Sequence, residues 1–245
     1  MSIADITIIG RTSLSDELAQ ILAKSGLNVS VTDLTENYST KASTSELVLE
    51  FLPDDLELKG KVLSNCDTSC QEKTILATTT AKPWITRLAH CTKRPDRFIG
   101  INFVKNPVQG KLLAQVTKGL QTTAQTVNIC VESLQKAGIV PVKLEESPGL
   151  IIDRVIASIV NEAALMYSSK LATIEDIDKM VKLCANWPFG PFEFADAVGI
   201  DKVVETLNML QQHFGPKYQP CLLLRRMLDA GWLGKKTGRG FYTYT

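Results

Sequence analysis

The part of the chain before Pro148 alternates short apolar runs with segments of helical periodicity. The runs cover residues 6–10, 29–33, 47–52, 74–78 and 98–103. Residues 18–24 carry apolar side chains at helical spacing, and Gly26 is suited to end that helix. Strands that alternate with helices are typical of βαβ units, whose strands lie parallel in one sheet. The sequence therefore predicts a Rossmann-like, doubly wound and mostly parallel α/β sheet.

The pattern changes near residues 145–148. Residues 150–168 form one long helical pattern, and Thr173 is a good N-cap for a helix over residues 173–182. The remaining residues read as helices separated by proline and glycine turns. We therefore predict two domains, an α/β domain over residues 1–146 and an all-helical domain over residues 147–245.

Composition excludes several classes of function. The net charge of +1 offers no electrostatic basis for binding nucleic acid or a membrane surface. No apolar run approaches the roughly 20 residues of a membrane span, and the first residues lack the features of a signal peptide. The six cysteines form no C-x-x-C pair, and the chain has only two histidines, so we expect no metal site. We expect a cytoplasmic protein.

Two stretches near the end carry a specific resemblance. Residues 187–201 read WPFGPFEFADAVGID, and residues 230–244 read AGWLGKKTGRGFYTY. Both resemble the C-terminal domain of the L-3-hydroxyacyl-CoA dehydrogenases, which oxidise a 3-hydroxyacyl thioester with NAD. The resemblance extends over residues 6–244 and is most specific after residue 147. It implies an NAD-binding-type domain followed by a helical domain that forms a dimer interface, so we expect a homodimer and an acyl-thioester substrate.

The dinucleotide turn of the family is altered in this chain. A G-x-G-x-x-G turn needs its glycines for a tight bend, for close approach of the pyrophosphate and for helix packing. Residues 10–15 read GRTSLS, so only Gly10 is kept. Thr12 places a β-branched side chain where the backbone should meet phosphate, whereas Ser15 is small enough for helix and strand to pack. Arg11 either supplies a compensating charge to a phosphate or points into solvent.

An acid about 20 residues after this turn accepts the ribose hydroxyls in such sites, and Asp33 stands there. The positions expected to meet a cofactor are Gly10, Thr12, Ser15, Asp33 and Glu50. Two interpretations remain open, namely weakened NAD binding and a Rossmann-shaped domain that binds no nucleotide.

The resemblance also shows substituted catalytic positions. The family's catalytic histidine, within R-F-x-G-x-H-F-F-N-P, corresponds to Asn102. That histidine takes the hydroxyl proton as hydride leaves for NAD, and asparagine cannot hold a proton near neutral pH. The Asn106–Pro107 pair stands one residue late. The glutamate that orients the histidine therefore falls at either Ala114 or Gln115.

Two further family positions differ. The serine that contacts the substrate oxygen corresponds to Ala81, with Thr79 or Thr80 as substitute donors. The asparagine of the P-G-F-I-V-N-R motif corresponds to Asp153, which either serves as a base or is held in an ion pair by Arg154. Residues 35–45 form a polar linker where the family has a long helical hairpin that helps dock coenzyme A.

Three hypotheses about function follow from these residues. The chain is an NAD-dependent dehydrogenase with altered residues, a non-catalytic dimeric scaffold or subunit of an acyl-processing assembly, or a binding protein for an acyl thioester or a nucleotide. The substituted positions predict an impaired or inactive enzyme.

Overall fold

The computed structural model describes residues 3–105 and 110–244. The first two residues and the Asn106–Pro107 pair lie outside the described part of the chain. The chain divides into two compact units, residues 1–147 and 148–245.

The first unit is built on one seven-stranded sheet with the order β2-β1-β3-β4-β5-β6-β7. Only the β5–β6 pair is antiparallel, so the predicted mostly parallel sheet is confirmed. Five strands match the apolar runs, but β6 and β7 were not predicted. In β7 the exposed residues and Pro141 interrupt the alternation of apolar and polar side chains that would predict a strand. The strands are β1 (Asp5–Ile9), β2 (Asn28–Thr32), β3 (Leu47–Glu50), β4 (Ile75–Thr78), β5 (Phe98–Lys105), β6 (Leu112–Lys118) and β7 (Val140–Glu145).

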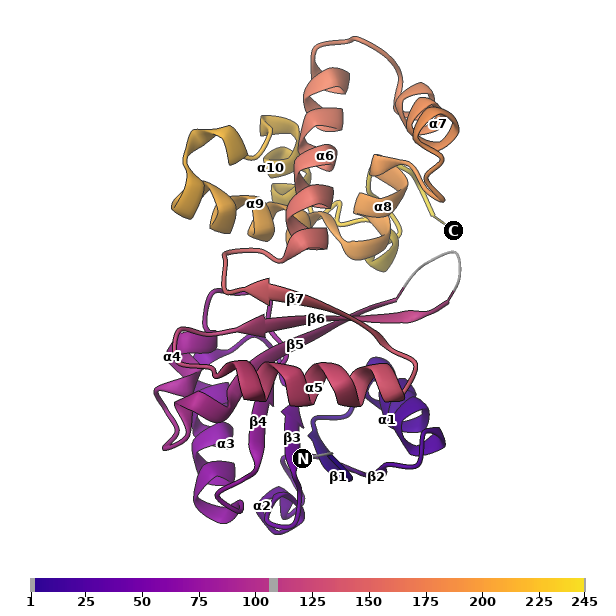
Figure 1. Ribbon diagram of the computed structural model, residues 1–245. Coiled ribbons are helices and arrows are strands. Elements are labelled where there is room, and N and C mark those ends of the chain that lie inside the picture. The colour runs from indigo at the N-terminus through magenta and orange to yellow at the C-terminus, as the bar shows by residue number, and fades with distance from the viewer. Residues whose placement is uncertain (1–2, 106–109, 245) are drawn as a thin grey trace. The chain divides into compact units, whose positions relative to one another are not determined.

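Helices cover both faces of this sheet (Figure 1). On one face α1 (Ser13–Lys24) and α5 (Ala124–Lys136) pack against strand residues such as Ile8 and Ile99. On the other face α2 (Tyr38–Ala42), α3 (Leu56–Ser69) and α4 (Ile85–Ala89) pack against residues such as Val48 and Leu76. Alternate residues of the strands therefore fill two separate cores, as a doubly wound sheet requires.

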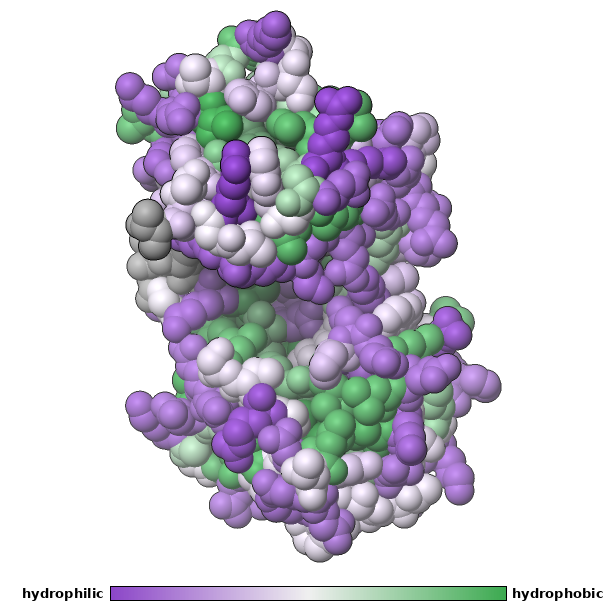
Figure 2. All heavy atoms as spheres, turned by 180° about the vertical axis from the view of Figure 1, so that it is seen from behind, coloured by the Kyte–Doolittle hydropathy of each residue, from purple (hydrophilic) through white to green (hydrophobic). Residues whose placement is uncertain are grey.

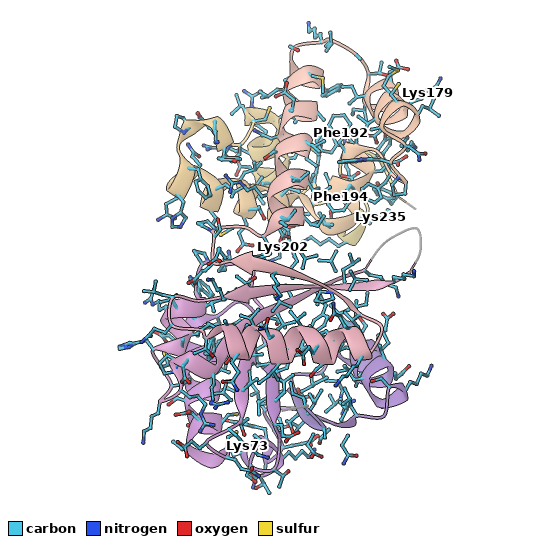
Figure 3. All side chains as sticks on the ribbon, viewed as in Figure 1. Lys73, Lys179, Phe192, Phe194, Lys202 and Lys235 are labelled. Atoms are coloured by element: carbon cyan, nitrogen blue, oxygen red, sulfur yellow. The ribbon has the colours of Figure 1, made fainter. Side chains whose placement is uncertain are left out.

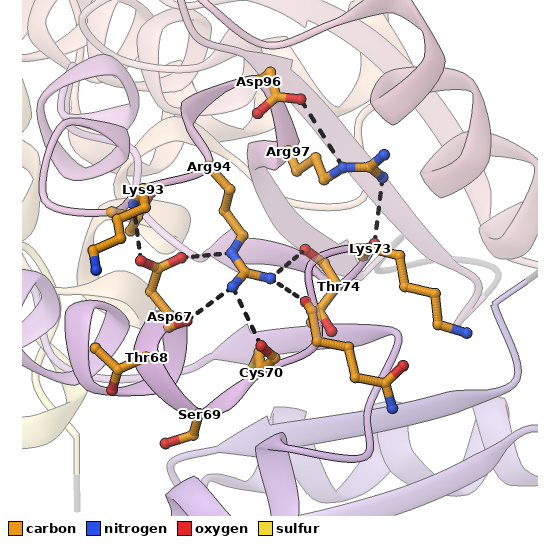
Figure 4. Close-up of polar contacts among 12 residues, drawn as sticks. Asp67, Thr68, Ser69, Cys70, Lys73, Thr74, Lys93, Arg94, Asp96 and Arg97 are labelled. Carbon is orange, nitrogen blue, oxygen red and sulfur yellow. Dashed lines mark hydrogen bonds and ion pairs between the residues drawn. The ribbon is translucent and has the colours of Figure 1, made fainter.

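Arg94 ties the end of α3 to the segment that leads into β5 (Figure 4). Its Nε lies 2.5 Å from Oδ1 of Asp67, and its Nη2 donates to the Asp67 carbonyl at 2.8 Å. The Asp67 carboxylate also accepts from the Lys93 amide at 2.8 Å. A cation at a helix C-terminus satisfies carbonyls that have no partner within the helix. This contact helps to place the 3₁₀ turn η1 (Pro95–Arg97) directly before β5.

The second unit is helical, as predicted. Its core is formed by apolar side chains that include Phe192, Leu207 and Leu224 (Phe192 is labelled in Figure 3). Thr173 caps α7, with its Oγ1 accepting from the Asp176 amide at 3.1 Å, so that predicted N-cap is confirmed. The elements are α6 (Ile151–Ser168), α7 (Ile174–Ala185), α8 (Pro191–Val198), α9 (Ile200–Phe214), η2 (Pro216–Tyr218), α10 (Leu222–Asp229) and η3 (Lys235–Thr237).

Two buried carboxylates explain why the C-terminal motifs have their sequence. Asp178 accepts from the Phe192 amide at 2.8 Å and from the Tyr242 hydroxyl at 2.8 Å, and burial raises the pKa of this carboxyl. Asp196 accepts from the amides of Phe241 and Tyr242, both at 2.9 Å. A Cβ on Gly240 would lie 2.0 Å from Oδ1 of Asp196, so only glycine fits there. The two acids thus hold the last strand-like segment against α7 and α8.

On the face that Figure 2 shows, polar side chains alternate with apolar patches. Among residues 3–105 and 110–244, no helix has the length and apolar character needed to cross a membrane.

Candidate active site

The register of β5 and β6 places two of the predicted catalytic positions side by side. Asn102 is paired with Gln115, and Phe103 is paired with Ala114. Residues directly opposite each other in an antiparallel pair project from the same face of the sheet. Gln115 is therefore the neighbour of Asn102, while Ala114 is fully buried in the core beneath α5. Of the two positions that the sequence left open, Gln115 lies opposite Asn102 and Ala114 does not.

The face of the sheet that carries Asn102 is closely covered by α4 at Gly100. Gly100 lies two residues before Asn102, and a Cβ there would come within 2.4 Å of the Ile85 side chain. Thr117, opposite Gly100, has a buried hydroxyl that finds no hydrogen-bond partner among the described residues. Amides and hydroxyls can donate and accept hydrogen bonds, but none of the side chains of Asn102, Gln115 and Thr117 takes up a proton near neutral pH.

The loop after β4 contains the position of the family's serine. Ala81 stands at this position and has no hydroxyl. The Thr79 hydroxyl donates to the Glu50 carbonyl at 3.0 Å, and Thr80 Oγ1 accepts from the Lys82 amide at 3.1 Å. Thr80 is also almost fully buried. Both threonine hydroxyls thus shape the loop, and the structure does not show either of them taking the place of the serine.

Glu50 is held inside the first unit by Lys59, which the sequence analysis overlooked. The Lys59 ammonium lies 2.8 and 2.9 Å from the two Glu50 oxygens, and both side chains are completely buried. Burial raises the pKa of the Glu50 carboxyl, and the Lys59 charge opposes that rise. Glu50 also accepts from the Thr78 hydroxyl and the Leu52 amide. Its carboxylate is therefore fully engaged in the interior and braces the strand ends.

Gly10 is required by the turn after β1. It has a φ of +100°, and a Cβ there would lie 2.9 Å from the Phe51 carbonyl oxygen. Thr12 is the N-cap of α1, and its Oγ1 accepts from the Ser15 amide at 3.0 Å. In return, Ser15 Oγ accepts from the Thr12 amide at 2.7 Å. The two residues that replace glycines thus form a reciprocal capping box.

This turn stands where a Rossmann fold binds a pyrophosphate. Such an anion binds the free amides and the positive end of a helix N-terminus. Here the Thr12 side chain supplies its own oxygen at that end, and Asp16 adds a negative charge in the first turn. Arg11 is exposed to solvent and pairs with Asp16 at 3.0 Å. Gly10 keeps the first glycine of the dinucleotide motif, and the half-buried Asp33 after β2 keeps its acid. Thr12 and Ser15 replace the other two glycines.

Asp153 lies in the first turn of α6 and lines a cavity of about 100 Å³ within the second unit. The cavity has mainly apolar walls, and Phe194 and Lys202 on its rim are labelled in Figure 3. The other lining residues are Ile152, Ile156, Ala157, Val198, Val203 and Thr206.

Arg154 does not serve as the ion-pair partner that the sequence suggested for Asp153. Its guanidinium lies 4.1 Å from the centre of the Phe214 ring, and its Nε donates to the Tyr218 hydroxyl at 3.0 Å. Consecutive helical residues project in different directions, which explains the separation. The family position at Asp153 is thus occupied by an acid, and Arg154 contacts Phe214 and Tyr218.

The polar linker is not wholly irregular. It holds the short helix α2, which begins at the N-cap Asn37, whose Oδ1 accepts from the Thr40 amide at 3.3 Å. Residues 33–46 contain no other helix, so the long helical hairpin expected for the family is absent from this described segment.

Known proteins show where the chain belongs. Residues 35–147 match the NAD binding domain of 3-hydroxyacyl-CoA dehydrogenases, and residues 149–244 match their C-terminal domain. The chain belongs to the 3-hydroxyacyl-CoA dehydrogenase family. The resemblance found in the C-terminal motifs is therefore confirmed, and with it an NAD-binding Rossmann fold of an oxidoreductase family. The NAD-domain match begins at residue 35, so it does not include the altered turn at residues 10–15.

Individual members of the 3-hydroxyacyl-CoA dehydrogenase family are similar over most of the chain. The 3-hydroxybutyryl-CoA dehydrogenase of Clostridioides difficile is 39% identical over 211 residues, which are 86% of this chain and 74% of that protein. The mitochondrial hydroxyacyl-coenzyme A dehydrogenase of Sus scrofa is 34% identical over 218 residues, 88% and 68% of the two chains. The crystal structure of (S)-3-hydroxybutyryl-CoA dehydrogenase from Ralstonia eutropha superposes with a TM-score of 0.94, at 31% identity, over 100% of both chains.

Proposed function

We propose that this family member is a severely impaired 3-hydroxyacyl-CoA dehydrogenase. The observation that carries the proposal is the pairing of Asn102 with Gln115 across β5 and β6. The family resemblance puts a histidine at position 102 and its orienting glutamate at position 114 or 115, and the strand pairing favours position 115. Two amides keep the hydrogen-bonding capacity of that pair but remove its ability to accept a proton. Loss of a general base typically lowers the rate by about 10²–10⁴-fold.

Binding of a short acyl thioester without turnover is the second candidate function. The cavity beside Asp153 has a volume of about 100 Å³ and mainly apolar walls. It is much smaller than the roughly 300–1,000 Å³ of a pocket for a drug-sized ligand. These dimensions suit the end of a short acyl chain. The similar proteins named above as 3-hydroxybutyryl-CoA dehydrogenases agree with a short substrate.

The test is the rate of NADH formation from (S)-3-hydroxybutyryl-CoA, followed by absorbance. We expect little or no turnover by the wild type and no further change in Asp153→Asn. Robust turnover that Asp153→Asn abolishes would make Asp153 the base and would contradict the impaired assignment. Robust turnover that survives in Asp153→Asn would contradict the account of the whole site.

We also propose that the protein is a homodimer formed through the second unit. Several large apolar side chains of that unit are more than half exposed, and Leu171 and Leu222 both line a groove of about 1070 Å³. Exposed apolar surface of this kind marks a site of protein contact. The residues are Leu171, Met180, Leu183 and Leu222.

Light scattering at micromolar concentrations is expected to give twice the mass of the 26.9 kDa chain. Leu171→Glu should shift the protein towards the monomer, because it places a charge in an apolar contact. Lys61→Glu, on the exposed surface of α3 in the first unit, is the control and should leave the mass unchanged. A monomeric wild type would contradict the proposal.

A further inference from the structure

We propose that the turn after β1 has exchanged its phosphate site for a self-contained helix cap, and that this exchange, more than any other feature of the first unit, limits its affinity for a dinucleotide. The inference concerns binding and is independent of the chemistry at Asn102.

The two substitutions in the turn act together. Thr12 and Ser15 occupy the second and third glycine positions of the family turn. They are joined by three hydrogen bonds: the Ser15 amide to Thr12 Oγ1 at 3.0 Å, the Thr12 amide to Ser15 Oγ at 2.7 Å, and Ser15 Oγ to the Thr12 carbonyl at 2.9 Å. Ser15 is completely buried, so its hydroxyl has no competing contact with solvent. The pair therefore forms one closed unit.

The Thr12 cap stands where a phosphate would bind. A helix start attracts phosphate because its first amides have no partner within the helix and its dipole is positive there. The Thr12 hydroxyl oxygen now accepts from one of these amides and stands over the helix start. A phosphate oxygen brought to the same place would meet an oxygen that is already hydrogen-bonded. The side-chain cap and a bound phosphate would therefore compete for the same place at the helix start.

The charges at this helix start point the same way. Asp16 lies in the first turn of α1, where its carboxylate interacts favourably with the positive end of the helix dipole. A bound phosphate would depend on the same interaction. The Arg11 guanidinium lies 3.0 Å from this carboxylate, so the turn offers a neutralised pair. No uncompensated cation remains among residues 10–16.

The backbone of the turn is otherwise intact. Gly10 keeps its φ of +100° and its close contact with the Phe51 carbonyl. The first residues of β1 and β2 remain paired in parallel, and the Gly10 amide donates to the Thr32 carbonyl at 2.9 Å. Substitution of two side chains should therefore be enough to reopen the site.

The experiment measures NADH binding by isothermal titration calorimetry. We expect the wild type to bind with a dissociation constant of about 1 mM or weaker. Thr12→Gly with Ser15→Gly should bind at least about tenfold more tightly, while its melting temperature falls because the cap is lost. Thr12→Gly alone should show part of the gain, and it keeps the test valid if the double variant does not fold.

Thr173→Gly is the matched control, because Thr173 caps α7 in the second unit with the same kind of bond. It should lower the melting temperature without changing NADH affinity. A micromolar dissociation constant for the wild type, or folded glycine variants with unchanged affinity, would overturn the inference. Because Asn102 is kept in every variant, these outcomes are separate from those of the turnover assay.

Discussion

Asn102→His combined with Gln115→Glu is expected to raise the rate of 3-hydroxybutyryl-CoA oxidation by about 10²–10⁴-fold over the wild type, which is the usual contribution of a general base. The two residues are opposite each other on β5 and β6, so the introduced imidazole and carboxylate would share one face of the sheet. A carboxylate beside a histidine orients the ring and stabilises its protonated form. The measurement is NADH absorbance at saturating cofactor.

The control for this experiment is Asn102→His combined with Ala114→Glu. Ala114 pairs with Phe103, faces the core beneath α5 and is completely buried. A glutamate there would be an unpaired buried charge, which is strongly unfavourable. We expect this variant to be unstable and to gain no activity. Equal activity of the two double variants would show that the register of β5 and β6 does not decide which residue meets position 102.

Lys59→Met is expected to lower the free energy of unfolding by about 3–5 kcal/mol, the usual result of removing one partner of a buried ion pair. The Lys59 ammonium has three hydrogens, and they meet Glu50, the Leu52 carbonyl at 2.9 Å and the Thr79 carbonyl at 3.0 Å. Methionine keeps the volume but leaves the Glu50 carboxyl buried without its cation. Since domains are stable by only about 5–15 kcal/mol, chemical denaturation should detect this loss readily.

Glu50→Leu combined with Lys59→Met should be less damaging than Lys59→Met alone, because no charge is then left unpaired. Lys236→Met is the surface control: Lys236 lies 2.6 Å from Asp201, but both side chains are partly exposed. Such a pair contributes about 0–1 kcal/mol. If Lys59→Met were as stable as Lys236→Met, the buried pair could not be a support of the strand ends.

Local pattern was enough for much of this fold. Apolar runs and helix caps depend on neighbours in sequence, and for this reason the five runs of the first unit, the helix end at Gly26 and the cap at Thr173 all appeared where the sequence predicts them. The motifs at residues 187–201 and 230–244 identified the family because their glycines and acids are fixed by close contacts around Asp178 and Asp196. Strands β6 and β7 were not predicted, because neither shows a clear alternation of apolar and polar residues.

The site itself was decided by tertiary structure. The sequence by itself named Asn102, Thr12, Ser15 and Asp153 as substituted positions, because each stands within a recognisable motif. It could not choose between Ala114 and Gln115, since cross-strand register depends on how two strands pair and a shift of one residue reverses the face. Nor could it show that Lys59 reaches Glu50 or that Arg154 turns to Phe214, because these contacts join residues that only folding brings together.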